Sequence, residues 1–126
     1  LLRDNQLPTE DILEQKIQFF VAFINNVIVG TIGIEKYHNF GLQRSLAVNH
    51  EFRNLNIGKK LLLHLFDYCS SENIEQLYLL TTTAEDYFYK FGFQSIDRDN
   101  VPEEISTTKE FQDICPLSAT TMYRKQ

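Results

Sequence analysis

The segment 42–71 constrains the fold most, because an apolar strand pattern runs through a short polar loop directly into a long helical pattern. The run 42–48 reads as a strand, and apolar residues recur at helical spacing over 57–71. A strand that leads into a helix in this way is typical of α/β domains. On a regular strand, one face would carry Leu42, Arg44, Leu46 and Val48.

The flanking patterns predict a mixed α/β sheet. Two runs rich in β-branched and aromatic residues, 18–24 and 27–34, flank Asn25-Asn26, a pair suited to a two-residue hairpin turn. The continuous apolar run 77–80 indicates a strand buried on both faces in the parallel part of the sheet. Further strands are expected at 93–96 and 119–124. One short helix is expected to start near Ile12. Two others are expected over 84–91, before Gly92, and over 108–114.

Composition and charge limit what the protein is expected to bind and where it is expected to occur. The net charge is −5 and no basic run occurs, which argues against nucleic acid binding. No apolar run is long enough to span a membrane. Cys69 and Cys115 form no CxxC pair, which suggests a reducing, cytoplasmic setting. The histidines show no metal-ligand spacing with each other or with the cysteines, so no metal site is expected; they are His38, His50 and His64.

The chain is expected to be one domain over 1–126, beginning with Leu rather than Met. Residues 1–5 read as the end of a helix. We therefore expect that a native N-terminal segment precedes Leu1.

The loop before the long helix carries the chemistry. A helix N-terminus presents unpaired amides and a favourable dipole to anions, and residues such as Asn56 and Gly58 let a backbone fold tightly around one. The loop also carries three cationic side chains in an otherwise acidic chain, which would strengthen anion binding. The candidate pyrophosphate cradle comprises Arg53, Asn54, Asn56, Ile57, Gly58, Lys59 and Lys60. The alternative is an ordinary strand–helix turn with surface charges.

Two motifs resemble the GCN5-related N-acetyltransferase (GNAT) superfamily. Arg53-x-x-Asn56-x-Gly58 is similar to its Gln/Arg-x-x-Gly-x-Gly/Ala signature, with Asn56 at the first Gly. The segment 84–93 resembles A-x-x-F-Y-x-x-x-G-F. The resemblance implies the acyl-CoA N-acyltransferase fold, an α/β fold with a mixed central sheet, splayed parallel strands and helices on both faces. In family terms, the first strand and most of the first helix would lie upstream of Leu1.

The resemblance also implies acetyl-CoA as cosubstrate and a small-molecule amine as acceptor. The strand end Leu46-Ala47-Val48 would bind the pantetheine arm through backbone groups. Phe88 falls where the family usually has the tyrosine proposed to protonate the leaving thiolate, so Tyr87 and Tyr89 become candidates. The alternative interpretation is that these two tyrosines are structural aromatic residues at the edge of the core. Thr81 stands where an Asn is usual, and both Thr81 and Phe88 are carried over as cofactor contacts.

Three residues are candidates for the acceptor side. Glu35 ends the hairpin strand beside the expected cleft and is the candidate base, the alternative being a solvated charge. Arg44 suits a substrate carboxylate, or equally a structural ion pair with a nearby acid. Ser45 is a weaker substrate candidate. An amino acid or similar small molecule is therefore the expected acceptor.

A narrower resemblance concerns the N-acetyltransferase-like family found beside arsenic-resistance genes. It rests on the run 79–83, on Asp97-Arg98-Asp99, and on Cys115-Pro116. Two competing interpretations remain open. One is a binding module that holds acyl-CoA without turnover, and the other is an assembly protein. The oligomeric state is left open, with a homodimer as one candidate because two-fold dimers are the commonest assemblies.

Overall fold

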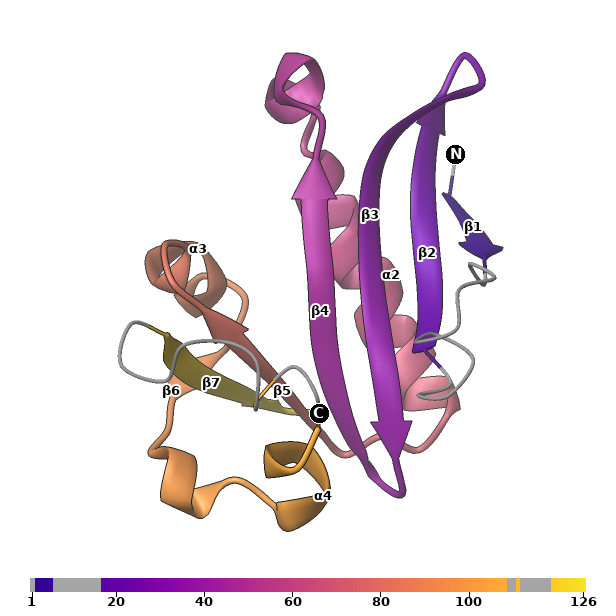
Figure 1. The fold of residues 1–126 in the computed structure, drawn as a ribbon. Coiled ribbons are helices and arrows are strands. Elements are labelled where there is room, and N and C mark those ends of the chain that lie inside the picture. The colour runs from indigo at the N-terminus through magenta and orange to yellow at the C-terminus, as the bar shows by residue number, and fades with distance from the viewer. Residues whose placement is uncertain (1, 6–16, 109–110, 112–118) are drawn as a thin grey trace.

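A computed structural model shows one central sheet with helices on both faces (Figure 1). It describes residues 2–5, 17–108, 111 and 119–126, apart from the side chains of residues 2–5, 45, 53 and 54. The seven strands are β1 (Leu2–Asn5), β2 (Ile17–Ile24), β3 (Val27–Tyr37), β4 (Phe40–Val48), β5 (Gln76–Thr81), β6 (Gln94–Ser95) and β7 (Thr120–Lys125). The helical elements are η1 (His50–Leu55), α2 (Ile57–Ser71), α3 (Glu85–Tyr89), η2 (Arg98–Asn100) and α4 (Glu103–Ser106).

The strand order is β1-β2-β3-β4-β5-β7-β6, and β4 and β5 are the pair that runs parallel. The other described neighbours run antiparallel. The predicted hairpin is confirmed, with Asn25 and Asn26 at φ 50° and 67°, as a turn between right-twisted strands requires. The predicted long helix is also confirmed, as α2.

Residues 2–5 are not the end of a helix, as their sequence suggested. They form β1, which pairs antiparallel with β2. The physical reason is that β2 has a second edge of backbone amides and carbonyls on the side away from β3, and an extended segment satisfies it. A short run of mixed apolar and polar residues is compatible with a helix or a strand, so pairing with the free edge of β2 determines its conformation.

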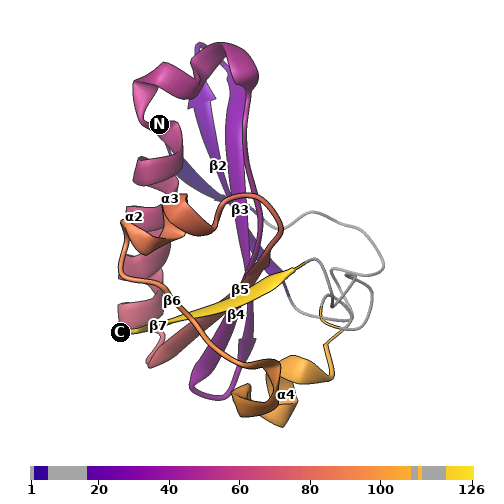
Figure 2. The ribbon, with the colours of Figure 1, turned by 90° about the vertical axis from the view of Figure 1, so that its left-hand side faces the viewer.

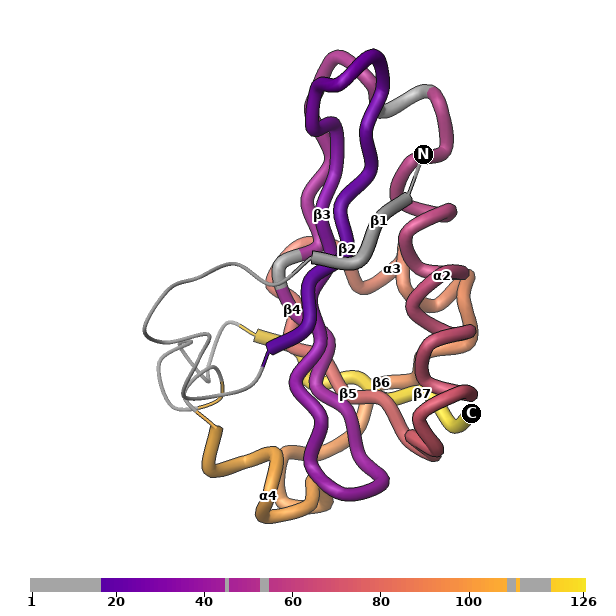
Figure 3. The backbone as a smooth tube through the Cα atoms, turned by 90° about the vertical axis from the view of Figure 1, so that its right-hand side faces the viewer, coloured from indigo at the N-terminus to yellow at the C-terminus, as the bar shows by residue number. Residues whose placement is uncertain are grey.

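Apolar clusters cover both faces of the sheet. The larger one packs α2 on β2 and β3 and includes Phe20, Ile32, Leu61 and Leu65. The smaller cluster lies on the opposite face and joins Leu42, Tyr78, Val101, Ile105 and Phe111. In Figures 2 and 3, α2 and α3 lie on one side of the sheet and α4 on the other. The expected arrangement of helices on both faces is therefore confirmed.

A bulge in β4 corrects the expected alternation along that strand. Thr31 pairs with Ala47 but Gly33 pairs with Arg44, so two residues of β4, Ser45 and Leu46, stand opposite one residue of β3. An extra residue shifts the phase of the side chains. Leu42 accordingly belongs to the smaller cluster, whereas Leu46 and Val48 pack against the larger one. The prediction that Leu42 and Val48 share a face is wrong for this reason.

The parallel pair separates soon after it forms. β4 pairs with β5 only from Phe40 to Leu42, opposite Gln76 to Tyr78. Beyond that point β4 continues to Val48, and β5 pairs along its whole length with β7. The two strands therefore diverge as a V, which is visible in Figure 1 and matches the expected splay.

The last third follows the predicted order with shifted boundaries. α3 lies within the predicted helix, and Gly92 follows it at φ 90°. β6 and β7 lie at the expected strands. α4 was not expected, because its four residues are too few to show a period. The helices expected near Ile12 and over 108–114 fall largely outside the described residues.

Candidate functional site

A cleft of about 680 Å³ occupies the V between β4 and β5. Its walls come from the end of β4, the start of α2 and one side of α3. The lining residues are Leu46, Ala47, Val48, Asn56, Gly58, Lys59, Thr83, Ala84, Tyr87 and Phe91. The structure thus brings six of the residues expected to bind a cofactor into one cleft: three from β4 and three from the loop.

The amino end of α2 lies at one end of this cleft, where an anion-binding site was expected. Asn56 ends η1 and precedes α2 with φ 57° and ψ 32°, the left-handed geometry expected of it. Its side chain makes no capping hydrogen bond to α2, and the first turn holds no acidic residue. The amides of that turn therefore have neither a side-chain cap nor a competing carboxylate, which suits them to bind an anion.

The rest of the predicted cradle divides into four groups. Lys59 is exposed and lines the cleft, while Ile57 is buried in the core and anchors the first turn. Lys60 is exposed but is not among the lining residues. The side chains of Arg53 and Asn54 lie outside the described part of the chain, as does that of Ser45.

Asn56 offers a test of this local geometry. We expect Asn56→Ala to lower the free energy of unfolding by about 1 kcal/mol, because alanine is strained in the left-handed region. Asn56→Gly is expected to stay within a few tenths of a kcal/mol of the original protein. Urea unfolding of the three proteins measures the difference. Equal stability of the alanine and glycine variants would contradict the left-handed assignment.

The end of β4 presents an unpaired edge to the cleft. No described strand pairs with β4 on the β5 side beyond Leu42. Backbone amides and carbonyls along that edge are strong hydrogen-bonding groups that need partners. An extended ligand arm can supply them by adding to the sheet as another strand would.

The aromatic residues of α3 separate into three environments. Tyr87 lines the cleft, and burial raises the pKa of its phenol above the ordinary value. Tyr89 is exposed, and its hydroxyl donates to Glu85 Oε1 at 2.9 Å and lies 3.1 Å from Ser95 Oγ. Phe88 is buried in the larger cluster, with its ring centroid 5.5 Å from that of Phe93. Only Tyr87 of these three lines the cleft.

Gly58 and Tyr87 meet across the cleft. A β-carbon built on Gly58 would lie 2.7 Å from the Tyr87 hydroxyl oxygen and 3.7 Å from Val48 Cγ2. The absence of a side chain at Gly58 is therefore what leaves room for the hydroxyl beside the first turn of α2.

Thr81 and the remaining α3 contacts differ from expectation. Thr81 Oγ1 accepts a hydrogen bond from the Ala84 amide at 3.0 Å and does not line the cleft. Sequence reasoning missed Thr83, Ala84 and Phe91 as lining residues. Ala84, Tyr87 and Phe91 share the spacing of one helical face, a signal that could have found them.

Glu35 and Arg44 form a pair on the face opposite α2. Glu35 is 0% exposed, and its Oε2 accepts from Arg44 Nη1 at 2.9 Å. Tyr37 donates its hydroxyl to Glu35 Oε1. Burial and this hydrogen bond raise the pKa of Tyr37 well above its ordinary value. Glu35 is thus a buried carboxylate and not a solvated charge, and the structural ion pair considered for Arg44 is present.

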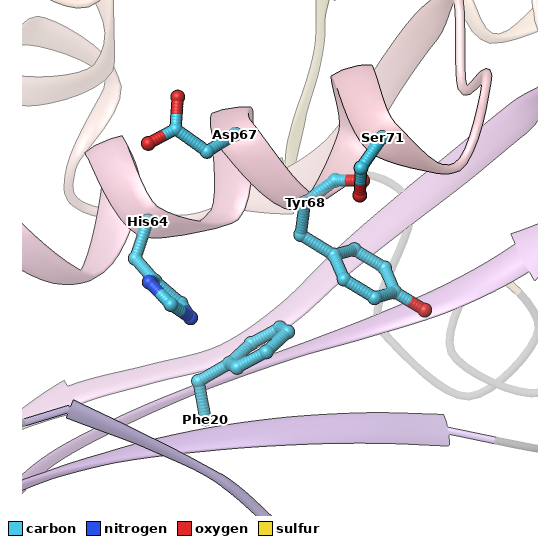
Figure 4. A pocket seen from close by; sticks show the side chains of 5 residues that line it. All are labelled: Phe20, His64, Asp67, Tyr68 and Ser71. Carbon is cyan, nitrogen blue, oxygen red and sulfur yellow. The ribbon is translucent and has the colours of Figure 1, made fainter.

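A second, smaller pocket of about 250 Å³ lies between α2 and β2 (Figure 4). It is lined by Phe20, His64, Asp67, Tyr68 and Ser71. The Phe20 ring makes edge-on contacts with His64 and Tyr68, with ring centroids 4.8 Å and 5.1 Å apart. The side chains that line it therefore include an aromatic cluster and come from no part of the loop.

No group of three or more potential metal ligands occurs among the described residues. None of the described helices is long and apolar enough to cross a membrane. Cys69 is buried, and burial raises its thiol pKa to about 12, while Cys115 falls outside the described part.

Comparison with known proteins places this cleft in context. A model of the acetyltransferase (GNAT) domain matches residues 15–95. An uncharacterized N-acetyltransferase of Chlorobaculum tepidum is 32% identical over 97 residues, covering 76% of this chain and 62% of that protein. The chain therefore spans about three fifths of that relative's length.

Solved structures share the fold. An acetyltransferase of the GNAT family from Staphylococcus aureus aligns with a TM-score of 0.72 at 31% identity, over 90% of this chain and 70% of that one. N-acetylglutamate synthase from Neisseria gonorrhoeae, complexed with coenzyme A and N-acetyl-glutamate, aligns with a TM-score of 0.78 at 18% identity. That alignment covers 99% of this chain and 35% of the synthase.

Proposed function

This chain belongs to the acetyltransferase (GNAT) family, and on that premise we propose that it transfers an acetyl group from acetyl-CoA to the primary amine of an amino acid or a similar small molecule. The observation that carries the proposal is the cleft between the diverging strands, which ends at the uncapped first turn of α2. A phosphate group and an extended arm are the two ligand features that such a cleft suits.

The parts of acetyl-CoA match separate parts of the cleft. Its pyrophosphate would bind the amides around Gly58, with Lys59 as a nearby cation. Its pantetheine arm would lie along the unpaired edge of β4, from Val48 toward Leu46. Acetyl-CoA supplies an activated acyl group, and holding the two substrates next to each other would contribute most of the rate through positioning.

The acceptor would approach from the face that carries Arg44. This residue lies two positions beyond Leu42, where the pairing of β4 with β5 ends. Glu35 holds the Arg44 guanidinium in place, and a guanidinium is a group that binds carboxylates. The names of distant relatives, which include amino-acid acetyltransferases, support an amino acid acceptor.

Proton transfer in this proposal does not depend on Glu35. Its carboxylate is already bonded to Arg44 and Tyr37, so water is the proposed acceptor of the amine proton. Thiols have an ordinary pKa of about 8.5, so the leaving sulfur needs little help from an acid near neutral pH. The association with arsenic resistance stays a prediction from residues of the C-terminal third, of which Cys115 and Pro116 fall outside the described part.

Calorimetry with acetyl-CoA and coenzyme A, followed by a thiol-release assay, tests the proposal. We expect binding of both ligands at micromolar concentration, and thiol release that depends on an added amino acid. Polyamines and acetyl-free coenzyme A serve as comparison acceptor and control. Binding without thiol release across amino acids and polyamines would favour a non-catalytic acyl-CoA-binding module. No binding of either ligand would contradict the cofactor site itself.

A further inference from the structure

The position of Tyr87 within the cleft is informative. Its hydroxyl oxygen lies 2.7 Å from the place that a Gly58 β-carbon would occupy, which puts it beside the first turn of α2. Its ring is held from α3 by contacts with Phe88 and Phe91, at centroid distances of 5.6 Å and 5.1 Å. The hydroxyl thus faces the expected anion-binding end of the cleft from the wall opposite the loop.

The surroundings of the hydroxyl suit an anionic ligand. The first turn of α2 has no side-chain cap and no acidic residue, and Lys59 lines the same part of the cleft. A phosphate oxygen bound to the amides near Gly58 would lie within hydrogen-bonding reach of a hydroxyl placed there. Burial raises the pKa of the Tyr87 phenol, so the group stays protonated and able to donate at neutral pH.

The reacting end of the ligand lies elsewhere. A pantetheine arm that runs along β4 from the phosphates carries the thioester toward the bulge at Ser45 and Leu46, on the order of 10 Å from Val48. The Tyr87 hydroxyl lies beside Gly58, at the opposite end of the cleft.

We propose that Tyr87 donates its hydroxyl to the pyrophosphate of acetyl-CoA and completes the cradle from the α3 side, rather than protonating the leaving sulfur. This inference rests on the proposed function, because it assigns a role within the same cofactor site. Tyr87 is then a binding residue. Its hydrogen bond would stabilise bound acetyl-CoA in the ground state and in the transition state alike.

Tyr87→Phe tests this inference with two donors, acetyl-CoA and S-acetyl-pantetheine, which lacks the pyrophosphate. We expect the substitution to raise the dissociation constant of coenzyme A and the KM for acetyl-CoA about tenfold, since a hydrogen bond to a charged group is lost. The kcat with acetyl-CoA should stay within about twofold. The kcat/KM for S-acetyl-pantetheine should be equal for the two proteins.

Tyr68→Phe is the matched control, because it removes a tyrosine hydroxyl in the smaller pocket and keeps the ring contact with Phe20. It should leave the dissociation constant of coenzyme A unchanged. Thermal unfolding of both variants checks that Tyr87→Phe remains folded, which its retained ring contacts favour.

The outcomes separate this inference from the proposed function. If the original protein binds coenzyme A and Tyr87→Phe binds it equally well, the role of Tyr87 is wrong and the cofactor site stands. If Tyr87→Phe lowers kcat to the same extent with both donors, Tyr87 acts at the thioester and the inference is overturned. If the original protein does not bind coenzyme A, the proposed function fails and this inference fails with it.

Discussion

Gly58→Asp is expected to abolish coenzyme A binding while the protein stays folded. The new carboxylate would enter the cleft at the first turn of α2, where its β-carbon lies 2.7 Å from the Tyr87 hydroxyl oxygen. There it would compete with phosphate for the amides and repel it. We expect the dissociation constant to rise about a hundredfold or more, which corresponds to about 2.7 kcal/mol of binding free energy.

The stability of this variant should not fall together with its affinity for coenzyme A. An acidic residue in the first turn of a helix interacts favourably with the helix dipole, by about 0.3–1 kcal/mol. Displacing the Tyr87 hydroxyl from beside the new β-carbon opposes this gain, so the free energy of unfolding should change by less than about 1 kcal/mol while binding measured by calorimetry is lost. Gly58→Asn is the control, since it has nearly the same shape without the charge and should weaken binding less. Unchanged affinity in Gly58→Asp would contradict the assignment of the cradle.

Arg44→Met is expected to destabilise the protein by about 3–5 kcal/mol. Glu35 is 0% exposed, and the substitution would leave its carboxylate buried without the guanidinium that lies 2.9 Å away. The Tyr37 hydroxyl alone cannot replace the lost charge. Chemical unfolding in urea measures the change, and coenzyme A binding should persist wherever the variant remains folded, because neither residue lines the cleft.

The double variant Glu35→Gln with Arg44→Met should recover most of this loss. Glutamine is neutral and keeps an oxygen that accepts from Tyr37, so no unpaired charge is buried. Recovery would identify the pair as structural. A loss below about 1 kcal/mol in the single Arg44→Met variant would contradict this.

The cofactor end of the site could be predicted from residue types that are adjacent in sequence. Asn56, Gly58 and Lys59 lie within four positions at the start of a helix, so local geometry places them together. Asn56 adopts the left-handed conformation that its side chain tolerates. The α3 wall was only partly predicted. Ala84 and Phe91 accompany Tyr87 on one helical face, but no local rule says which face of a five-residue helix meets the cleft.

The surroundings of Glu35 and Arg44 could not be predicted from sequence because they depend on distant contacts. Glu35 ends a strand pattern and looks exposed in sequence, yet Arg44 and Tyr37 enclose it through the pairing of β3 with β4. The face that each residue of β4 occupies depends on the bulge at Ser45 and Leu46. A bulge is set by how two strands align, and one strand read alone does not contain that information.

The sequence by itself therefore determined the elements whose causes are local. These are the Asn25-Asn26 turn, the amphipathic α2 and the loop that begins it. Tertiary structure alone decided three features: the conversion of residues 2–5 into an edge strand, the phase of side chains along β4, and the burial of Glu35. The physical reason is that the free energies of strand pairing and of charge burial depend on which segments become neighbours on folding. The composition of a single segment does not determine them.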